Sequence, residues 1–170
     1  MMDIIEKARV FAADKHASQK RKYTDQPYFN HLEAVASTLQ SAGVMEPTVL
    51  AAAYLHDTVE DTDATMQDII REFGADVGEL VYWLTDAEEG NRESRTLMSS
   101  WRLARAPMQA KLIKFADIID NATSIREHDR GFFRLWAAEK VEILKRMLEV
   151  EGSGLSEHAL FKRAWAATTA

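Results

Sequence analysis

The chain contains no cysteine, and only 3 of its 170 residues are proline and 7 are glycine. Without cysteine there is no disulfide, no thiol nucleophile and no thiolate metal ligand, so any metal must be held by histidine, aspartate or glutamate. Such ligands favour manganese, magnesium, iron or zinc over a structural zinc knot. The scarcity of proline and glycine indicates few turns between long elements.

A long apolar run and an excess of positive charge are also absent. No stretch of about 18 apolar residues occurs, so no membrane span is expected. The amphipathic N-terminus, "MMDIIEKARVFAADKHA", is charged and does not resemble a signal peptide. The net charge is −6 at pH 7, whereas nucleic-acid binders are usually basic. We therefore expect a cytoplasmic protein with no nucleic-acid or membrane partner.

Hydrophobic residues make up 46% of the chain, and their spacing is helical. Ile4, Ala8 and Phe11, for example, recur on one helix face. No alternation with period two persists over the length of a strand, and no Asn-Gly hairpin signal occurs. These patterns predict an all-α bundle of about eight to ten helices. Residues 1–170 are expected to form a single domain, with 152–170 as its C-terminal helix.

A few residue types indicate where the helices begin and end. Pro27 can begin a helix at its first turn, and that helix would end near Gly43. Thr65 with Asp68 reads as an N-cap and an acidic first turn, and Gly74 is a stop signal. Other helices are expected at 47–57, 76–86, 94–106, 108–127, 132–150 and 156–168, and loops at 17–27, 87–95 and 151–155.

Two histidines and two aspartates lie in apolar contexts on separate predicted helices. His31 is on a half-apolar face, His56 closes an apolar run and Asp57 follows it directly. Asp117 lies in the apolar run "AKLIKFADIIDNATSI" and needs a partner, such as Asn121 at i+4, because burying an unpaired carboxylate is very costly. Each residue alone also fits an ordinary hydrogen-bonded core or surface position. Together they indicate a manganese, iron or zinc site with positions left for water.

This order of histidine, histidine-aspartate and aspartate resembles the HD-domain superfamily of metal-dependent phosphohydrolases. The resemblance implies four metal ligands, which are His31, His56, Asp57 and Asp117. The segments "HASQKRKYTDQPYFNHLEAVA", "AAYLHDTVEDT", "FGADVGELVYWLTD" and "AKLIKFADIIDN" are further similar to the hydrolase domain of RelA/SpoT-type enzymes. Among these, the chain most resembles the stand-alone small alarmone hydrolases, over residues 5–145.

The resemblance implies a manganese-dependent 3′-pyrophosphohydrolase of the stringent response. Its substrates would be guanosine 3′,5′-bis(diphosphate) (ppGpp) and the pentaphosphate (pppGpp). A metal-activated water would release pyrophosphate from the ribose 3′ position. Iron, zinc, cobalt or magnesium remain alternatives to manganese, and a monomer and a homo-oligomer both remain open.

The Glu-Asp pair of the family falls on Glu60 and Asp61, which are the expected catalytic residues. Glu60 is four residues after His56, and a carboxylate there can orient water or take its proton. Without the preceding His-Asp, the segment would fit a solvated helix end. The family also implies that His16 supports the predicted loop 17–27, which is rich in basic residues. The substrate-binding residues that it implies are Arg21, Lys22, Asn121, Ser124 and Trp136.

The chain departs from the larger enzymes at three positions. Ile118 and Thr123 stand where basic residues are usual, and Asp120 stands where histidine or tyrosine is common. Fewer cations leave the exact substrate open. The first alternative is therefore an HD-type phosphohydrolase that acts on NADPH or another nucleotide phosphoester. The second is a catalytically inert alarmone-binding module, against which the complete ligand set argues.

Overall fold

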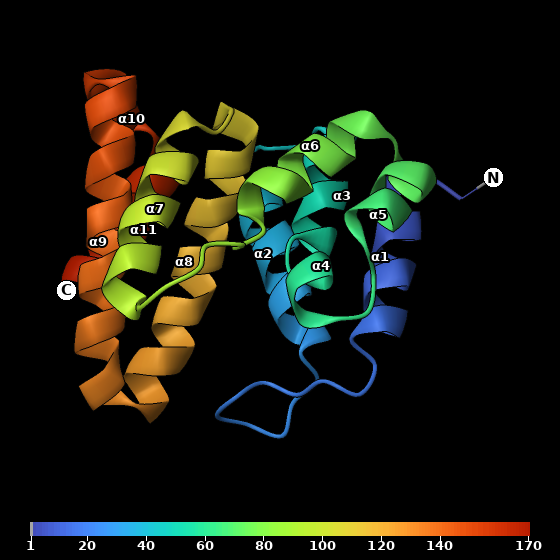
Figure 1. The fold of residues 1–170 in the computed structure, drawn as a ribbon, viewed down its shortest axis with the longest axis horizontal. Coiled ribbons are helices and arrows are strands. Elements are labelled where there is room, and N and C mark those ends of the chain that lie inside the picture. The colour runs from blue at the N-terminus through green and yellow to red at the C-terminus, as the bar shows by residue number, and fades with distance from the viewer. Residues whose placement is uncertain (1) are drawn as a thin grey trace. The chain divides into compact units, whose positions relative to one another are not determined.

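The structure, a computed structural model, describes residues 2–170, and helices connected by loops make up almost all of them (Figure 1). No β-strand occurs in this described part of the chain, where an isolated bridge pairs Lys20 with Pro27. The chain divides into two compact units, Met1–Thr85 and Asp86–Ala170. The predicted all-α class is confirmed.

The described helices of unit 1 are α1 (Ile4–Lys15), α2 (Phe29–Ser41), α3 (Pro47–Leu55), α4 (Thr58–Asp61), α5 (Met66–Phe73) and α6 (Ala75–Leu84). Those of unit 2 are α7 (Arg92–Arg105), α8 (Met108–His128), α9 (Arg130–Glu151), α10 (Ser153–Glu157) and α11 (Ala159–Thr169). The short helices α4 and α10 have 4 and 5 residues. Within residues 2–170, no helix combines the length and apolar character needed to cross a bilayer.

Helix α3 is the buried centre of unit 1. It packs against α1, α2 and α6, and its residues Val49 to Ala53 and Leu55 are all buried. The alanines in this run leave room for neighbouring helices to approach closely. Because α3 is held on several sides, its end at Leu55 is rigidly placed, and His56 follows at once.

In unit 2, the long helix α8 packs against α7, α9 and α11. Ile113, Phe115 and Ile118 of α8 are fully buried. The Phe115 ring meets Phe161 of α11 edge to face, with ring centres 5.6 Å apart. The apolar side of α8 therefore forms the core of this unit.

The start of α2 differs from the prediction, whereas the cap of α5 agrees with it. Pro27 is extended and bridges to Lys20 across the loop, so α2 begins only at Phe29. A proline has no N–H to donate, but its fixed φ suits an extended residue just before a helix as well as a first turn. Thr65 and Asp68 form a complete capping box, as their spacing predicts.

Two predicted loops are shorter than expected because caps begin the next helix early. The side chain of Asn91 accepts a hydrogen bond from the Ser94 N–H at 2.9 Å, so α7 starts at Arg92 inside the predicted loop 87–95. Gly152 ends α9 with φ of 79°, and the chain returns to a helix at Ser153. The predicted loop 151–155 is therefore mostly the short helix α10.

A buried ion pair in unit 2 gives a prediction about stability. The Lys111 side chain on α8 is 1% exposed, and its ammonium pairs with Glu151 at the end of α9. Glu151→Ala should lower the free energy of unfolding by about 2–3 kcal/mol, because it leaves a buried ammonium without its carboxylate. Lys111→Met removes the charge and keeps the volume, so it should change stability by less than about 1 kcal/mol. Urea denaturation measures both, and equal losses would contradict this account.

Candidate functional site

Three of the four predicted metal ligands are neighbours in unit 1. His31 lies near the start of α2, and His56 and Asp57 form the turn between α3 and α4. The Oδ2 atom of Asp57 is 3.6 Å from Nε2 of His31 and 3.1 Å from Nε2 of His56. The two imidazole side chains are 0% and 2% exposed, and the Asp57 side chain is 22% exposed. A ligand could therefore reach this group from the Asp57 side.

The hydrogen bonding of His56 suits a metal ligand. Its Nδ1 is 2.8 Å from the carbonyl oxygen of Ala53, which can only accept, so Nδ1 carries the hydrogen. In the neutral ring the lone pair is then on Nε2, the atom that faces Asp57. Metal-binding histidines usually have their other ring nitrogen held in this way. Two imidazoles and a carboxylate that converge in a buried place are a donor set that fits a divalent cation.

Sequence reasoning did not identify Tyr28 as a site residue. Its Oη donates a hydrogen bond to Asp57 Oδ2 at 2.5 Å, and its ring centre is 5.5 Å from that of His31. Burial alone would raise the pKa of Asp57, but the positive charge that His56 and His31 carry when protonated, and the hydrogen bonds that they then donate, outweigh burial and hold that pKa well below its usual value. Asp57 is therefore an oriented anion. The position of Tyr28, three residues before His31, was the available signal.

The predicted catalytic pair lies on α4, directly after the Asp57 turn. The side chains of Glu60 and Asp61 are both exposed. Asp61 Oδ2 accepts a hydrogen bond from Gln19 Nε2 at 3.0 Å, and Gln19 Oε1 is 2.5 Å from Nδ1 of the buried His16. Gln19 was not singled out from the sequence. The contact ties α4 to the loop that follows α1.

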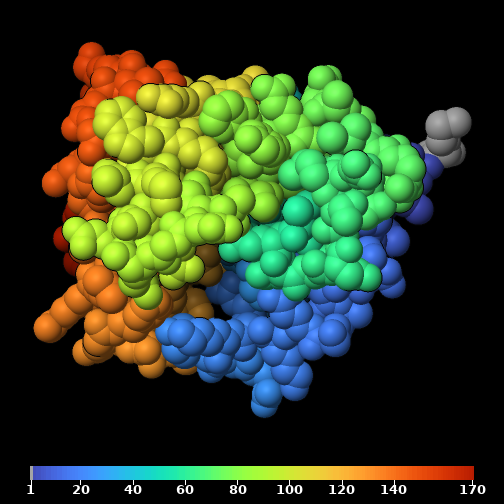
Figure 2. All heavy atoms as spheres, in the orientation of Figure 1, coloured from blue at the N-terminus to red at the C-terminus, as the bar shows by residue number. Residues whose placement is uncertain are grey.

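Arg21 and Lys22 lie in that loop, residues 17–27, which is called the first loop below. The Arg21 N–H donates to the Gln26 carbonyl at 2.9 Å, so the loop folds back on itself. Figure 2 shows the atoms of the first loop, in blue, at the surface of unit 1. Lys22 is exposed and Arg21 is partly exposed. Both side chains are therefore accessible to a ligand from solvent.

In unit 2, Asp117 has the partners that its burial requires. Asn121 Nδ2 donates to Asp117 Oδ1 at 2.6 Å, and Lys114 Nζ is 2.8 Å from Oδ2. Burial lowers the pKa of Lys140, and the positive charge of Lys114 lowers it further. Neither lysine was singled out from the sequence, although Lys114 belongs to the quoted motif around Asp117. They supply positive charge to this part of unit 2.

The remaining predicted substrate-binding residues of unit 2, Ser124 and Trp136, differ in their exposure to solvent. Ser124 is partly exposed on α8, and its carbonyl oxygen is 2.8 Å from Nδ1 of His128. Trp136 is buried, and the ammonium of Lys140 lies 5.7 Å from its ring centre. Ile118 is fully buried in the core, so a basic residue there would lack solvent. Substrate contact by Ser124 and Trp136 stays a prediction.

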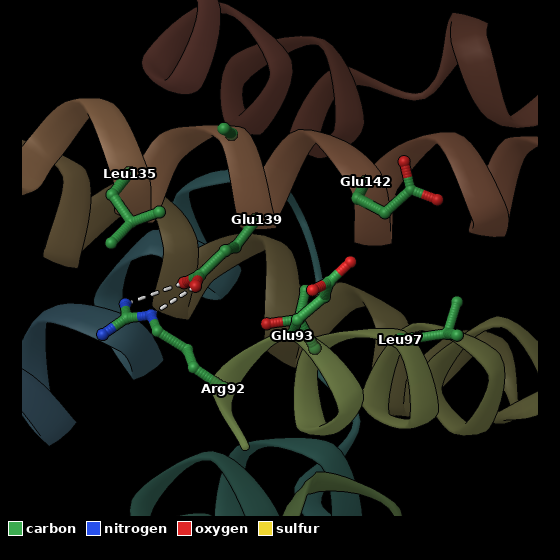
Figure 3. Close-up of a pocket in the computed structure, with 8 residues that line it drawn as sticks. Arg92, Glu93, Leu97, Leu135, Glu139 and Glu142 are labelled. Carbon is green, nitrogen blue, oxygen red and sulfur yellow. Dashed lines mark hydrogen bonds and ion pairs between the residues drawn. The ribbon is translucent and has the colours of Figure 1, made fainter.

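A surface pocket of about 580 Å³ lies between α7 and α9 of unit 2 (Figure 3). Arg92 and Glu139 pair across it, with Nη2 and Oε2 2.9 Å apart, and Leu97 and Leu135 add apolar surface. The lining includes none of the predicted metal, catalytic or substrate-binding residues. Its volume alone therefore does not make it the hydrolytic site.

Comparisons with known proteins identify the family to which this chain is similar. A family model described as "HD domain" matches residues 8–146. The guanosine-3′,5′-bis(diphosphate) 3′-pyrophosphohydrolase MESH1 of Drosophila melanogaster is 36% identical over 145 residues, 79% of this chain and 81% of that protein. Its Homo sapiens namesake is 37% identical over 145 residues, with the same coverages. A solved structure, "A metazoan ortholog of SpoT hydrolyzes ppGpp and plays a role in starvation responses", matches with a TM-score of 0.82 and 29% identity, over 99% of this chain and 94% of that one.

Proposed function

Because the chain belongs to the HD-domain family, we propose that it is a metal-dependent hydrolase that removes the 3′-pyrophosphate from ppGpp and pppGpp. The observation that carries this proposal is the 36% identity to a ppGpp 3′-pyrophosphohydrolase over most of both chains. Water adds to the phosphorus on the ribose 3′ oxygen, that P–O bond breaks, and pyrophosphate and guanosine 5′-diphosphate or 5′-triphosphate result. Residues 1–170 are proposed to act as one hydrolase domain, since the family match covers parts of both units.

The proposed metal ligands are His31, His56, Asp57 and Asp117, with Mn²⁺ as the first choice of ion. Three observations support this set: the converging donors in unit 1, the buried carboxylate in unit 2 and the match of residues 8–146 to the HD-domain family. When bound, such an ion supplies a Lewis acid that polarises water and phosphate oxygens. Iron, zinc, cobalt and magnesium accept the same donor atoms, so metal analysis of the purified protein decides among them.

The other proposed roles belong to side chains of the protein itself. Glu60 and Asp61 orient the attacking water and take its proton, which their exposed positions on α4 permit. The guanidinium of Arg21 can stack on the guanine, and the ammonium of Lys22 can neutralise phosphate. Asn121, Ser124 and Trp136 complete the proposed substrate-binding set. The Asn121 side chain also donates a hydrogen bond to Asp117, so it connects this set to a proposed metal ligand.

A substrate screen with resolved products tests this function. Purified protein with Mn²⁺ is incubated separately with ppGpp, pppGpp, NADPH and deoxynucleoside triphosphates. Pyrophosphate should appear from ppGpp and pppGpp in step with the guanosine product. Consumption of NADPH or another nucleotide without turnover of ppGpp would favour the wider HD-type phosphohydrolase. Binding of ppGpp without turnover of any substrate would favour the inert binding module.

The first loop gives a prediction about substrate affinity. Arg21→Ala should raise KM for ppGpp about tenfold and leave kcat nearly unchanged, because it removes binding that is equal in the ground and transition states. Lys20→Ala is the matched control, since the Lys20 ammonium pairs with Asp25 at 3.2 Å in the same loop. Steady-state kinetics measures both variants. Unchanged KM and kcat in Arg21→Ala would identify the loop as ordinary surface.

A further inference from the structure

Gln19 connects the first loop to α4 through its side chain and its backbone. Its Nε2 donates to Asp61 Oδ2 at 3.0 Å, and its carbonyl oxygen accepts from the Tyr28 N–H at 2.9 Å. Tyr28 in turn donates from Oη to Asp57. One glutamine therefore contacts both the proposed catalytic carboxylate and the residue that orients a proposed metal ligand.

The neighbours of the Gln19 amide determine its orientation. An ionised carboxylate only accepts, so the NH₂ group must face Asp61 and the oxygen must face His16. Nδ1 of His16, 2.5 Å from that oxygen, then carries the hydrogen. On its other side, Nε2 of His16 is 3.5 Å from Oγ1 of Thr58, the first residue of α4. The amide is thus fixed by a ring that itself contacts α4.

The ring of His16 is well placed to hold the amide still. It is buried, and it stacks on the Tyr28 ring with ring centres 5.1 Å apart and planes 24° apart. A side chain locked by packing and hydrogen bonds restricts the groups that it touches. Asp61 is exposed, and without such a contact its carboxylate would sample several rotamers in solvent.

We propose that His16 and Gln19 are positioning residues that hold Asp61 in one orientation toward the attacking water. This inference rests on the proposed function, because Asp61 has a reacting partner only if the chain is a hydrolase. A proton acceptor works only when it is within hydrogen-bond reach of the proton. Gln19 is neutral and acts on Asp61 through geometry, so its loss should affect turnover more than substrate affinity.

Kinetics of a glutamine pair tests the positioning role. Gln19→Ala should lower kcat for ppGpp about tenfold and change KM by less than about twofold. Gln26→Ala is the matched control in the same loop, because the Gln26 side chain accepts instead from Asn30 Nδ2 at 3.2 Å. It should leave kcat unchanged. A raised KM with unchanged kcat in Gln19→Ala would show that Gln19 only supports the loop, and would overturn the proposal.

A double-mutant comparison and a spectroscopic signature separate this role from the proposed function. In an Asp61→Ala background, Gln19→Ala should cause no further loss of kcat, because its effect acts through Asp61. The side-chain amide NMR signals of Gln19 should shift in Asp61→Ala and stay in place in Asp63→Ala. If the side-chain amide signals of Gln19 do not shift in Asp61→Ala, the positioning role is overturned even when the enzyme is active. Absence of ppGpp turnover by the unaltered protein would instead overturn the proposed function.

Discussion

Replacing Asp57 with alanine is expected to remove the bound divalent ion and to lower kcat/KM for ppGpp by about a thousandfold. The Asp57 carboxylate supplies the negative charge that faces the Nε2 atoms of His31 and His56. Without it, two imidazoles remain in unit 1, and nitrogen donors alone are weaker ligands for a hard cation. Inductively coupled plasma mass spectrometry gives the metal content per chain, and steady-state kinetics gives the loss of activity.

Asp63→Ala is the matched control for the loss of an aspartate. Asp63 lies six residues further on, is 85% exposed and pairs with Lys15 at 2.8 Å on the surface of the same unit. This variant should keep its metal and its activity. Circular dichroism establishes whether Asp57→Ala remains folded. A folded Asp57→Ala protein with the metal content of the unaltered chain would show that the metal centre proposed around this turn is wrong.

Glu60→Gln is expected to lower kcat for ppGpp about a hundredfold while the metal content and KM change little. The substitution keeps the size of the side chain, but an amide cannot take a proton from water. Because Glu60 is not among the proposed metal ligands, its effect should lie in the chemical step and not in assembly of the site. Rapid-quench measurement of a single turnover reports that step directly.

The control for Glu60→Gln is the same change at Glu79, an exposed glutamate on α6 of the same unit. Glu79→Gln alters the net charge identically and should leave kcat unchanged. If Glu60→Gln retains full turnover, the proton passes to another group, and Asp61 becomes the first candidate. If it loses its metal instead, Glu60 acts as a ligand and not as a base.

Local pattern was sufficient for most helices. Apolar spacing and helix-end residues placed α3, α5 and α6 close to their observed bounds, and apolar spacing also indicated α1, because both kinds of signal depend on residues only a few positions apart. The errors lie at helix ends. Asn91 caps the start of α7, so the predicted loop 87–95 is too long. Gly152 alone separates α9 from the next helix, so the predicted loop 151–155 is also too long. Polar residues and glycines occur both in helix caps and in loops, so the sequence does not fix the exact residue at which a helix begins or ends.

The sequence by itself singled out His31, His56, Asp57 and Asp117 as candidate metal ligands, because histidines and aspartates in apolar contexts are unusual and their order resembles the HD-domain family. Only the tertiary structure showed which side chains hydrogen-bond to the site carboxylates and so orient them. Tyr28 bonds to Asp57 across 29 positions and Gln19 bonds to Asp61 across 42. Contacts over such separations depend on how helices pack and loops fold back, and no local spacing encodes them. The orientation of the carboxylates therefore became visible only in the folded chain.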